Sequence, residues 1–338
     1  MTRKGSASPP SPLEGEGWGG GSGLPPEFAL IARHFQPLAG AGSLALTDDA
    51  AILTLPRDRE LVIAADALVG GVHFLPDDPP DLVARKLLRT NLSDLAAMGA
   101  EPLGYLMTVS APQATPDAWF AAFTAGLAAD QQEFRVALLG GDTTSTPGPI
   151  SLSLTILGTV RPGQAIRRAG AAPGDAVWVS GTIGDGALGL LAATGRLDDP
   201  TGYLADRYRL PRPRLKLGKC LHGVVTAGMD VSDGLVQDLG HVCRASGCAA
   251  EIDAASVPLS DAARAANQLE RCLTGGDDYE LLLAVPPARE AVLQQAAKEA
   301  GVAVTRIGRF LAGAPRVTVR AADGAAMRLV RGGWSHFA

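Results

Sequence analysis

The chain has 338 residues, of which 46 % are hydrophobic and 19 % are charged, so it has enough apolar material for a large core, most simply divided between two domains. A net charge of −5 argues against nucleic acid or an anionic membrane as the main partner. No run approaches about 18 apolar residues, which argues against a membrane span. The four cysteines include no Cys-x-x-Cys pair, so we expect reduced thiols and a cytoplasmic protein.

The N-terminal half begins with a segment rich in glycine, serine and proline. This composition predicts a disordered extension over residues 1–26, followed by an amphipathic helix that starts near Pro26. Apolar runs predict strands over 51–55, 61–65, 105–110 and 150–160, with helices over 80–98 and 116–130. Strands and helices mix here without strict alternation, which favours an α+β domain. A turn at 161–163 marks the expected boundary between domains 27–162 and 163–338.

The second half also mixes strands and helices. Strands are expected over 176–180, 224–229, 281–285, 302–307 and 316–319, with a helix over 185–193. The glycine-rich segment 181–186 between a strand and a helix is similar to a phosphate-binding turn. It lacks the Lys-Ser/Thr of a Walker loop and the order of a Rossmann fingerprint, so we interpret it as a strand-to-helix turn.

The predicted helix 80–98 contains polar residues where apolar ones are expected. At 100° per residue, Asn91 and Asp94 fall inside the apolar face. A buried carboxylate is costly unless it is paired or binds a metal. The alternatives are a salt bridge to Arg85 or Arg89, or a helix that ends early so that Asp94 caps a loop.

Other acidic residues stand next to the apolar runs, flanked by glycine or alanine. These acids are Asp48, Asp49, Asp66, Asp142, Asp230 and Asp233. Carboxylate oxygens suit magnesium, and small neighbours allow phosphate to approach, so the pattern predicts a cleft that holds Mg²⁺ against the phosphates of ATP. Each loop alone is better explained by an ordinary turn, but five such places, with Asp94 included, weaken that explanation considerably.

Four weaker signals have two interpretations each. His73 is either structural or a phosphate contact, and Arg168, next to Arg167, is either solvated or a clamp for the triphosphate. Trp334 either packs the C-terminal tail or stacks on a ring. The acidic segment 275–280 suits an organic cation or a metal.

The order of these motifs resembles the thiamine-monophosphate kinase family, within the superfamily of aminoimidazole ribonucleotide synthetase and selenophosphate synthetase. The resemblance runs from Phe28 to Phe337, nearly the whole chain beyond the extension. It rests on Asp66-Ala-Leu-Val, Gly71-Val-His-Phe, Asn91-Leu-Ser-Asp-Leu-Ala-Ala-Met-Gly-Ala, Gly140-Gly-Asp-Thr-Thr, Asp230-Val-Ser-Asp-Gly-Leu, Gly275-Gly-Asp-Asp-Tyr-Glu-Leu and Gly333-Trp-Ser-His-Phe.

The resemblance implies a homodimer in which the N-terminal α+β domains pair through their sheets, each with a larger C-terminal α/β domain. It implies transfer of the γ-phosphoryl group of ATP to thiamine monophosphate, assisted by several Mg²⁺ ions. The implied metal ligands are Asp49, Asp66, Asp94, Asp142, Asp230 and Asp233, of which Asp94 and Asp142 are expected to be essential for turnover. The implied ATP contacts are Gly141, Asp142, Arg168 and Ser232. The implied substrate contacts are His73, Asp277 and Trp334.

The chemistry agrees with this resemblance, because a phosphate acceptor is already an anion and needs no general base. Three features depart from the family pattern: Thr47 replaces a glycine, Ala64 and Ala65 replace hydroxyl residues beside Asp66, and the extension has no counterpart. Selenophosphate synthesis would need an N-terminal cysteine, yet the first is Cys220. A ring-closing synthetase would lack Asp-Asp-Tyr-Glu, and a non-catalytic sensor would be expected to have lost carboxylates that are present here.

Overall fold

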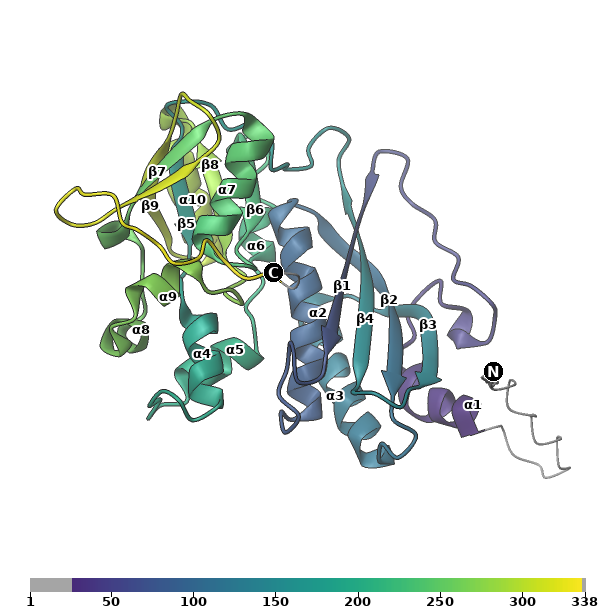
Figure 1. Ribbon diagram of the computed structural model, residues 1–338. Coiled ribbons are helices and arrows are strands. Elements are labelled where there is room, and N and C mark those ends of the chain that lie inside the picture. The colour runs from purple at the N-terminus through teal and green to yellow at the C-terminus, as the bar shows by residue number, and fades with distance from the viewer. Residues whose placement is uncertain (1–25, 336–338) are drawn as a thin grey trace, which may run out of the picture.

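The computed structural model describes residues 26–335, which form two β-sheets with helices between and around them (Figure 1). The first sheet contains β1 (Glu60–Val69), β2 (Glu101–Ala111), β3 (Leu138–Ser145) and β4 (Ser151–Val160). Its order is β1-β4-β2-β3, with β2 and β3 parallel and the other pairs antiparallel. The chain enters through α1 (Pro26–Leu30), a π-helical turn at Ile31–Phe35 and 3-10 turns at Gln36–Leu38 and Leu44–Leu46.

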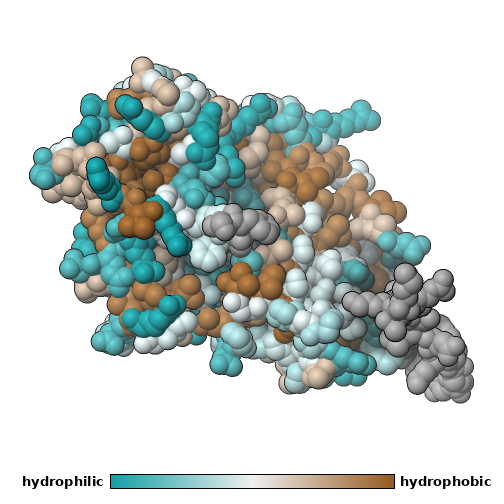
Figure 2. Space-filling model, viewed as in Figure 1, coloured by the Kyte–Doolittle hydropathy of each residue, from teal (hydrophilic) through white to brown (hydrophobic). Residues whose placement is uncertain are grey.

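Among residues 26–335, helices cover only one face of this first sheet. The helices α2 (Pro80–Ala97) and α3 (Asp117–Phe134) lie on that side (Figure 1). The opposite face leaves Leu61, Ile63 and Leu106 exposed, although strand residues that face water are usually polar. Figure 2 shows hydrophobic surface gathered over this part of the molecule.

The second sheet has six strands in the order β10-β7-β9-β5-β8-β6. They are β5 (Ala176–Ser180), β6 (Ala227–Asp230), β7 (Ala249–Asp253), β8 (Leu281–Val285), β9 (Val304–Leu311) and β10 (Val317–Arg320). Its helices are α4 (Asp185–Ala193), α5 (Tyr203–Arg209), α6 (Leu215–Gly218), α7 (Leu235–Ser246), α8 (Asp261–Ala266), α9 (Leu269–Thr274) and α10 (Glu290–Ala300). Short 3-10 turns lie at Ala254–Ser256 and Pro287–Arg289. Alternate residues of β8 pack toward α7 and toward α10, so this sheet is covered on both faces.

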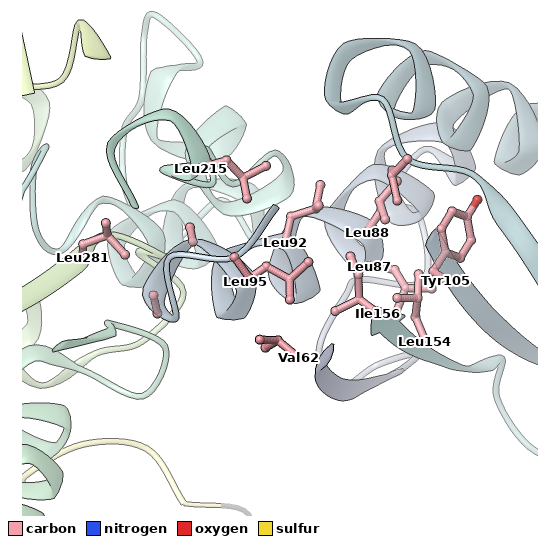
Figure 3. Packing of buried hydrophobic residues seen from close by; sticks show 14 of the residues in the cluster. Val62, Leu87, Leu88, Leu92, Leu95, Tyr105, Leu154, Ile156, Leu215 and Leu281 are labelled. Atoms are coloured by element: carbon pink, nitrogen blue, oxygen red, sulfur yellow. The ribbon is translucent and has the colours of Figure 1, made fainter. Parts of the chain in front are cut away.

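The helix α2 is buried between the two sheets. Its side chains join one apolar cluster with strands of the first sheet and with α6, α10 and β8 of the second half. Figure 3 shows Leu92 and Leu95 of α2 between Leu281 on one side and Ile156 on the other. Most of its 18 residues are buried, including polar ones. The helix therefore presents polar groups to both halves of the molecule.

The two-domain α+β and α/β fold class is confirmed by this architecture. The helix 185–193 and the strands 176–180 and 281–285 have the predicted bounds. The predicted strand 51–55 is wrong: the segment is irregular, and Ile52 makes one backbone hydrogen bond, to the Gly42 carbonyl, instead of joining a ladder. The strand β7 was not predicted, and β3 runs through Asp142.

The predicted extension, apart from Pro26 where α1 begins, lies outside the described residues. His336 and Phe337 of the C-terminal motif lie outside them as well. Across residues 26–335, no helix is both long and apolar enough to cross a membrane.

Candidate active site

The segment Asn91-Leu-Ser-Asp of α2 connects the helix to both sheets. The Asn91 side-chain oxygen accepts a hydrogen bond from the backbone N–H of Asp66 on β1, at 3.2 Å. The Ser93 hydroxyl donates to Asp230 at the end of β6, at 2.7 Å. The carboxyl of Asp94 shares a hydrogen bond with that of Asp66. One turn of helix therefore brings together carboxylates from three elements.

Neither structural alternative for Asp94 holds. The helix continues to Ala97, so Asp94 does not cap a loop. Arg85 and Arg89 donate instead to Asp130 of α3, at 2.8 and 2.7 Å. Asp94 thus faces the interior without the arginine partners that its position on the helix suggested.

The electrostatics of this cluster are repulsive in the absence of a cation. Burial, followed by the charges of Asp230 and Asp66, raises the pKa of Asp94 to about 8. Burial and the charges of Asp230 and Asp233 raise the pKa of Asp66 to about 6, and its hydrogen bond with Asp94 opposes that rise. Burial raises the pKa of Asp230 as well. Like charges held together favour protonation unless a positive ligand replaces the proton.

The loop after β6 adds Asp233 to this cluster. It is fixed by Asp238 of α7, where one carboxylate oxygen accepts backbone N–H groups of Ser232, Asp233 and Gly234 at 3.0 to 3.1 Å. Burial and the charge of Asp230 raise the pKa of Asp238 to about 7. Arg168 also reaches the cluster, since its charge lowers the pKa of both Asp94 and Asp230.

The donor set fits magnesium better than a metal that needs a complete protein cage. No three histidine, cysteine or acidic side chains within residues 26–335 converge tightly enough to bind one ion by themselves. Magnesium usually takes one or two carboxylates and completes its shell with water and substrate phosphates. The buried, mutually repelling carboxylates Asp66, Asp94 and Asp230 match that requirement.

A second group of residues surrounds Asp277. Its carboxylate accepts hydrogen bonds from Lys86 at 3.2 Å and from the Tyr279 hydroxyl at 3.1 Å. Lys86 also donates to the backbone carbonyl of His73, at 3.0 Å. The charges of Asp66 and Asp230 act on Tyr279 and help to raise its pKa, after burial and Asp277. The Asp277 group therefore lies beside the carboxylate cluster.

Successive residues of the loop 275–280 belong alternately to the site and to the buried interior. Asp277 and Tyr279 have positive φ angles of 71° and 53°, which are uncommon for residues with side chains. Between and after them, Asp278 accepts the backbone N–H groups of Gly184 and Gly186, and Glu280 pairs with Arg207. These buried anchors hold the unusual backbone in place.

The turn 181–186 joins β5 to α4, as predicted. Asp278 already occupies two of its amide donors, at 2.7 and 3.0 Å. A phosphate would have to displace a buried carboxylate to bind there. The strand-to-helix interpretation is the one that the structure supports.

The backbone of Trp334 lies next to the carboxylate cluster. Its N–H donates to the Asp233 carbonyl at 2.9 Å, and its own carbonyl accepts from Gln237 at 2.7 Å. The residue as a whole is 52 % exposed. The tail is thus held beside Asp233 while the indole keeps a large accessible surface.

Three predicted residues lie apart from the cluster within one chain. Asp49 is exposed in the loop before β1. Asp142 lies opposite Thr108 on the uncovered face, whereas Asp66 faces α2. Two strands separate β3 from β1, a distance of roughly 14 Å at the usual strand spacing. Gly141 has a structural reason to be glycine, since a Cβ there would lie 1.8 Å from the Met107 carbonyl oxygen.

Four residues of the site were not singled out from the sequence: Lys86, Ser93, Asp238 and Tyr279. Ser93 and Tyr279 stand inside motifs that were recognised, so their position beside acidic residues was an available signal. Asp238 follows Asp233 by five residues, and Lys86 lies in a helix with arginines on either side. Nothing in the local pattern distinguishes these two from surface charges.

Comparison with known proteins identifies the family to which the chain belongs. Residues 47–160 match the family model of AIR synthase related protein, N-terminal domain, and residues 172–320 match the C-terminal domain. A thiamine-monophosphate kinase of Caulobacter vibrioides is 47 % identical over 299 residues, which cover 86 % of this chain and 85 % of that protein.

Two solved structures are also similar. Thiamine-monophosphate kinase from Stenotrophomonas maltophilia has a TM-score of 0.77 and 41 % identity, covering 83 % of this chain and 91 % of that chain. AaThiL complexed with AMPPCP and TMP has a TM-score of 0.74 and 30 % identity, covering 86 % and 91 %. The chain therefore belongs to the thiamine-monophosphate kinase family of enzymes.

Proposed function

We propose that this protein transfers the γ-phosphoryl group of ATP to the phosphate of thiamine monophosphate, giving thiamine diphosphate and ADP. The observation that carries the proposal is the juxtaposition of two groups, the buried carboxylates around Asp94 and the loop that bears Asp277. The first suits metal-bound phosphates and the second suits an organic acceptor. The similarity to AaThiL, whose complex contains AMPPCP and TMP, supports the same pair of ligands here.

Several Mg²⁺ ions are the proposed cofactors, bound by Asp66, Asp94, Asp230 and Asp233. When bound, they would supply charge neutralisation for the phosphates that meet in the site. The raised pKa values of Asp66 and Asp94 support this assignment, because a divalent cation relieves the repulsion that otherwise favours protonation. Ser93 and Asn91 orient the carboxylate of Asp230 and the backbone of Asp66 by hydrogen bonds.

The proposed transfer is a direct in-line displacement. An oxygen of the acceptor phosphate forms a bond to the γ-phosphorus while the bond from that phosphorus to the β,γ-bridging oxygen breaks, and the electron pair leaves on ADP. No side chain has to remove a proton, since the acceptor oxygen is already anionic. The contribution of the protein is to place two anions next to each other and exclude other acceptors.

Arg168 and Ser232 are the proposed ATP contacts in the cleft. Arg168 supports this role because its charge already acts on Asp94 and Asp230. Ser232 stands between these carboxylates and the acceptor loop, since its carbonyl accepts the backbone N–H of Asp277 at 2.9 Å. A guanidinium at this place would pair with phosphate oxygens.

His73, Asp277 and Trp334 are the proposed acceptor contacts. The Nδ1 atom of His73 accepts the backbone N–H of Val69 at 3.0 Å, so the neutral ring has its proton on Nε2, where it can donate to a phosphate oxygen. The exposed indole of Trp334 suits stacking on an aromatic or cationic ring. Asp277 supplies a carboxylate for the cationic or N–H-bearing part of the acceptor.

The proposed assembly is a homodimer that pairs the uncovered faces of the N-terminal sheets. The exposed Leu61, Ile63 and Leu106 support it, because a second copy would remove this apolar surface from water. Asp142 lies on the same face, so pairing would carry it, with Gly141, toward the second copy. We therefore place Asp142 and Gly141 in the ATP site of the partner subunit, and Asp49 is proposed as a further metal ligand.

The proposed location is the cytoplasm, and the proposed domains are 27–162 and 163–338. All four cysteines of the chain are unpaired, which suits a reducing compartment. Bacterial relatives that are thiamine-monophosphate kinases support an enzyme of thiamine biosynthesis rather than a binder of nucleic acid or membrane.

The test is a product assay. Purified full-length protein is incubated with ATP, Mg²⁺ and thiamine monophosphate, and thiamine diphosphate is measured by chromatography beside a panel of other phosphorylated acceptors. We expect thiamine diphosphate only when ATP and Mg²⁺ are both present. Absence of that product, together with ADP release on a different acceptor, would refute the proposed substrate.

A further inference from the structure

Lys86 is a buried cation that the reaction outlined above does not use. It lies on α2 with only 2 % of its surface exposed, although lysine is rarely buried without a specific partner. Burial lowers its pKa, and the charge of Asp277 opposes that effect. The free-energy cost of removing this ammonium group from water has to be offset by the contacts that it makes.

The ammonium group of Lys86 has three partners from three parts of the chain. It donates to the His73 carbonyl at 3.0 Å and to Asp277 at 3.2 Å, and it lies 3.6 Å from the centroid of the Tyr208 ring. Tyr208 in turn donates its hydroxyl to the same His73 carbonyl, at 3.2 Å. The turn after β1, the loop 275–280 and α5 therefore meet at one nitrogen atom.

Two of these partners are the residues assigned to the acceptor. His73 comes from the N-terminal half and Asp277 from the C-terminal half, so no short segment of backbone fixes their separation. We propose that Lys86 is a positioning residue that holds the backbone of His73 and the carboxylate of Asp277 at a fixed separation and thereby sets the geometry of the acceptor site. This inference rests on the proposed function.

The same helix carries the carboxylate cluster. Lys86 and Asp94 are eight residues apart on α2, about 12 Å along a helix axis. A rigid helix that bears the anchor of the acceptor loop in its first half and a metal carboxylate near its C-terminal end fixes the acceptor relative to the nucleotide. Tyr279 reinforces this arrangement, because its hydroxyl holds the second oxygen of Asp277 at 3.1 Å.

The assignment also defines how Asp277 meets its ligand. Because Lys86 balances its charge, Asp277 does not act as a bare counter-ion for a cationic ring. It acts as an oriented acceptor of hydrogen bonds, with 31 % of its side chain still accessible. Recognition by Asp277 then depends on where thiamine monophosphate carries a hydrogen-bond donor, more than on the net charge of that molecule.

The test is Lys86→Met in the full-length protein, with KM measured separately for thiamine monophosphate and for ATP. We expect KM for thiamine monophosphate to rise about 10- to 100-fold, the effect of losing a hydrogen bond to a charged group, while KM for ATP changes less than about 2-fold. The matched control is Arg85→Met, which removes a cation one position earlier on α2 but leaves Asp130 paired with Arg89. It should leave both KM values unchanged.

A second variant keeps the test decisive if Lys86→Met does not fold. Tyr279→Phe removes only the hydroxyl that holds Asp277, and it should raise KM for thiamine monophosphate in the same direction without changing KM for ATP. Where both variants fold, KM for thiamine monophosphate in the double variant should rise by less than the product of the two single fold-changes. The reason is that both substitutions act through Asp277.

The outcomes separate the two proposals. If wild-type protein forms no thiamine diphosphate, the proposed function fails. If Asp277→Asn raises KM for thiamine monophosphate while folded Lys86→Met and Tyr279→Phe leave it unchanged, the positioning role fails and the function stands. A parallel rise in both KM values for Lys86→Met would also overturn the inference, since it would indicate a general loss of domain packing.

Discussion

At the scale of single residues, Asp94 shows how a polar side chain in an apolar pattern can indicate function. Its helix position places it inside the protein, and the arginines that might have neutralised it pair with Asp130. Its neighbours are carboxylates, so the metal-free protein accommodates it by retaining a proton. This costly placement is the reason for proposing Asp94 as a metal ligand.

We predict that Asp94→Asn abolishes turnover and makes the metal-free protein less sensitive to pH. The pKa of Asp94 is raised from 3.8 to about 8 in the folded state, which therefore binds its proton more tightly than the unfolded chain does. The resulting stabilisation is present at low pH and is lost as pH rises through about 8, so the free energy of unfolding falls over that range. An amide does not titrate there.

The measurement is urea unfolding of EDTA-treated wild type and variant between about pH 4 and pH 9, which covers the interval from the unfolded pKa of 3.8 to the folded pKa of about 8. The fall in stability with pH should be smaller in Asp94→Asn. Added Mg²⁺ should stabilise the wild type more at high pH, since its ligands must be deprotonated. Near-normal turnover in the variant would show that Asp94 is not a metal ligand.

The four thiols give a second prediction at this scale. Cys243 and Cys272 are buried, and burial raises the pKa of each to about 12, while Cys220 is exposed. Because the thiolate is the reactive form, Cys220 alone should react with a thiol reagent in the native state, even at alkaline pH. Mass spectrometry after brief labelling checks this, and rapid labelling of Cys272 would mean that the packing around α4 opens readily.

At the scale of elements, α2 and α3 are joined by an ion pair that is separate from the site. Asp130 is fully buried and accepts hydrogen bonds from Arg85 and Arg89. We predict that Asp130→Asn lowers the free energy of unfolding by about 3 kcal/mol, because it leaves buried guanidinium groups incompletely paired. Urea denaturation measures the loss, and KM for both substrates should stay unchanged. A change in KM without loss of stability would contradict this role.

The elements best predicted from sequence are strands that are apolar along nearly their whole length. Fully apolar runs such as 176–180 and 281–285 form central strands with the expected bounds. The run 51–55 has the same local pattern but pairs with no strand within the described chain. Strand formation depends on a partner strand, which the local pattern does not reveal. The strand β7 was missed because the charge of Glu251, which pairs with Arg309 of β9 and Arg320 of β10, interrupts its apolar pattern.

The site residues also divide into those that the sequence predicts and those that it does not. Asp66, Asp94, Asp230 and Asp233 could be found because acids beside apolar runs are conspicuous, and the structure gathers them. Lys86 could not, because α2 is buried on both sides and its periodicity does not separate an inner from an outer face. The outward direction of Asp142 depends on strand register, which the residue order alone does not specify.

At the scale of the whole molecule, the uncovered sheet face and Asp142 lead to one prediction. If Asp94 of one subunit and Asp142 of its partner serve the same site, Asp94→Asn and Asp142→Asn should each be inactive alone. Unfolded together and refolded as a mixture, they should recover about a quarter of wild-type activity, since half of the dimers then contain one intact site. Product formation per protein measures the recovery.

The control for this mixture changes the sheet face itself. Ile63→Lys places a charge on exposed apolar surface, so it should yield monomers by sedimentation and remove the recovery when introduced into both partners. Lack of recovery with intact dimers would instead assign Asp142 to the site of its own chain or to no site.

The position of α2 also determines how the molecule folds. Because one helix fills the core of both halves, neither half has a complete interior without it. The two sheets should therefore fold and unfold together as one cooperative unit, and not as two independent domains. A fragment that starts at residue 163 would expose Leu281 and Leu283 and is expected to aggregate, so the kinase would reach its native state only after both halves have been synthesised.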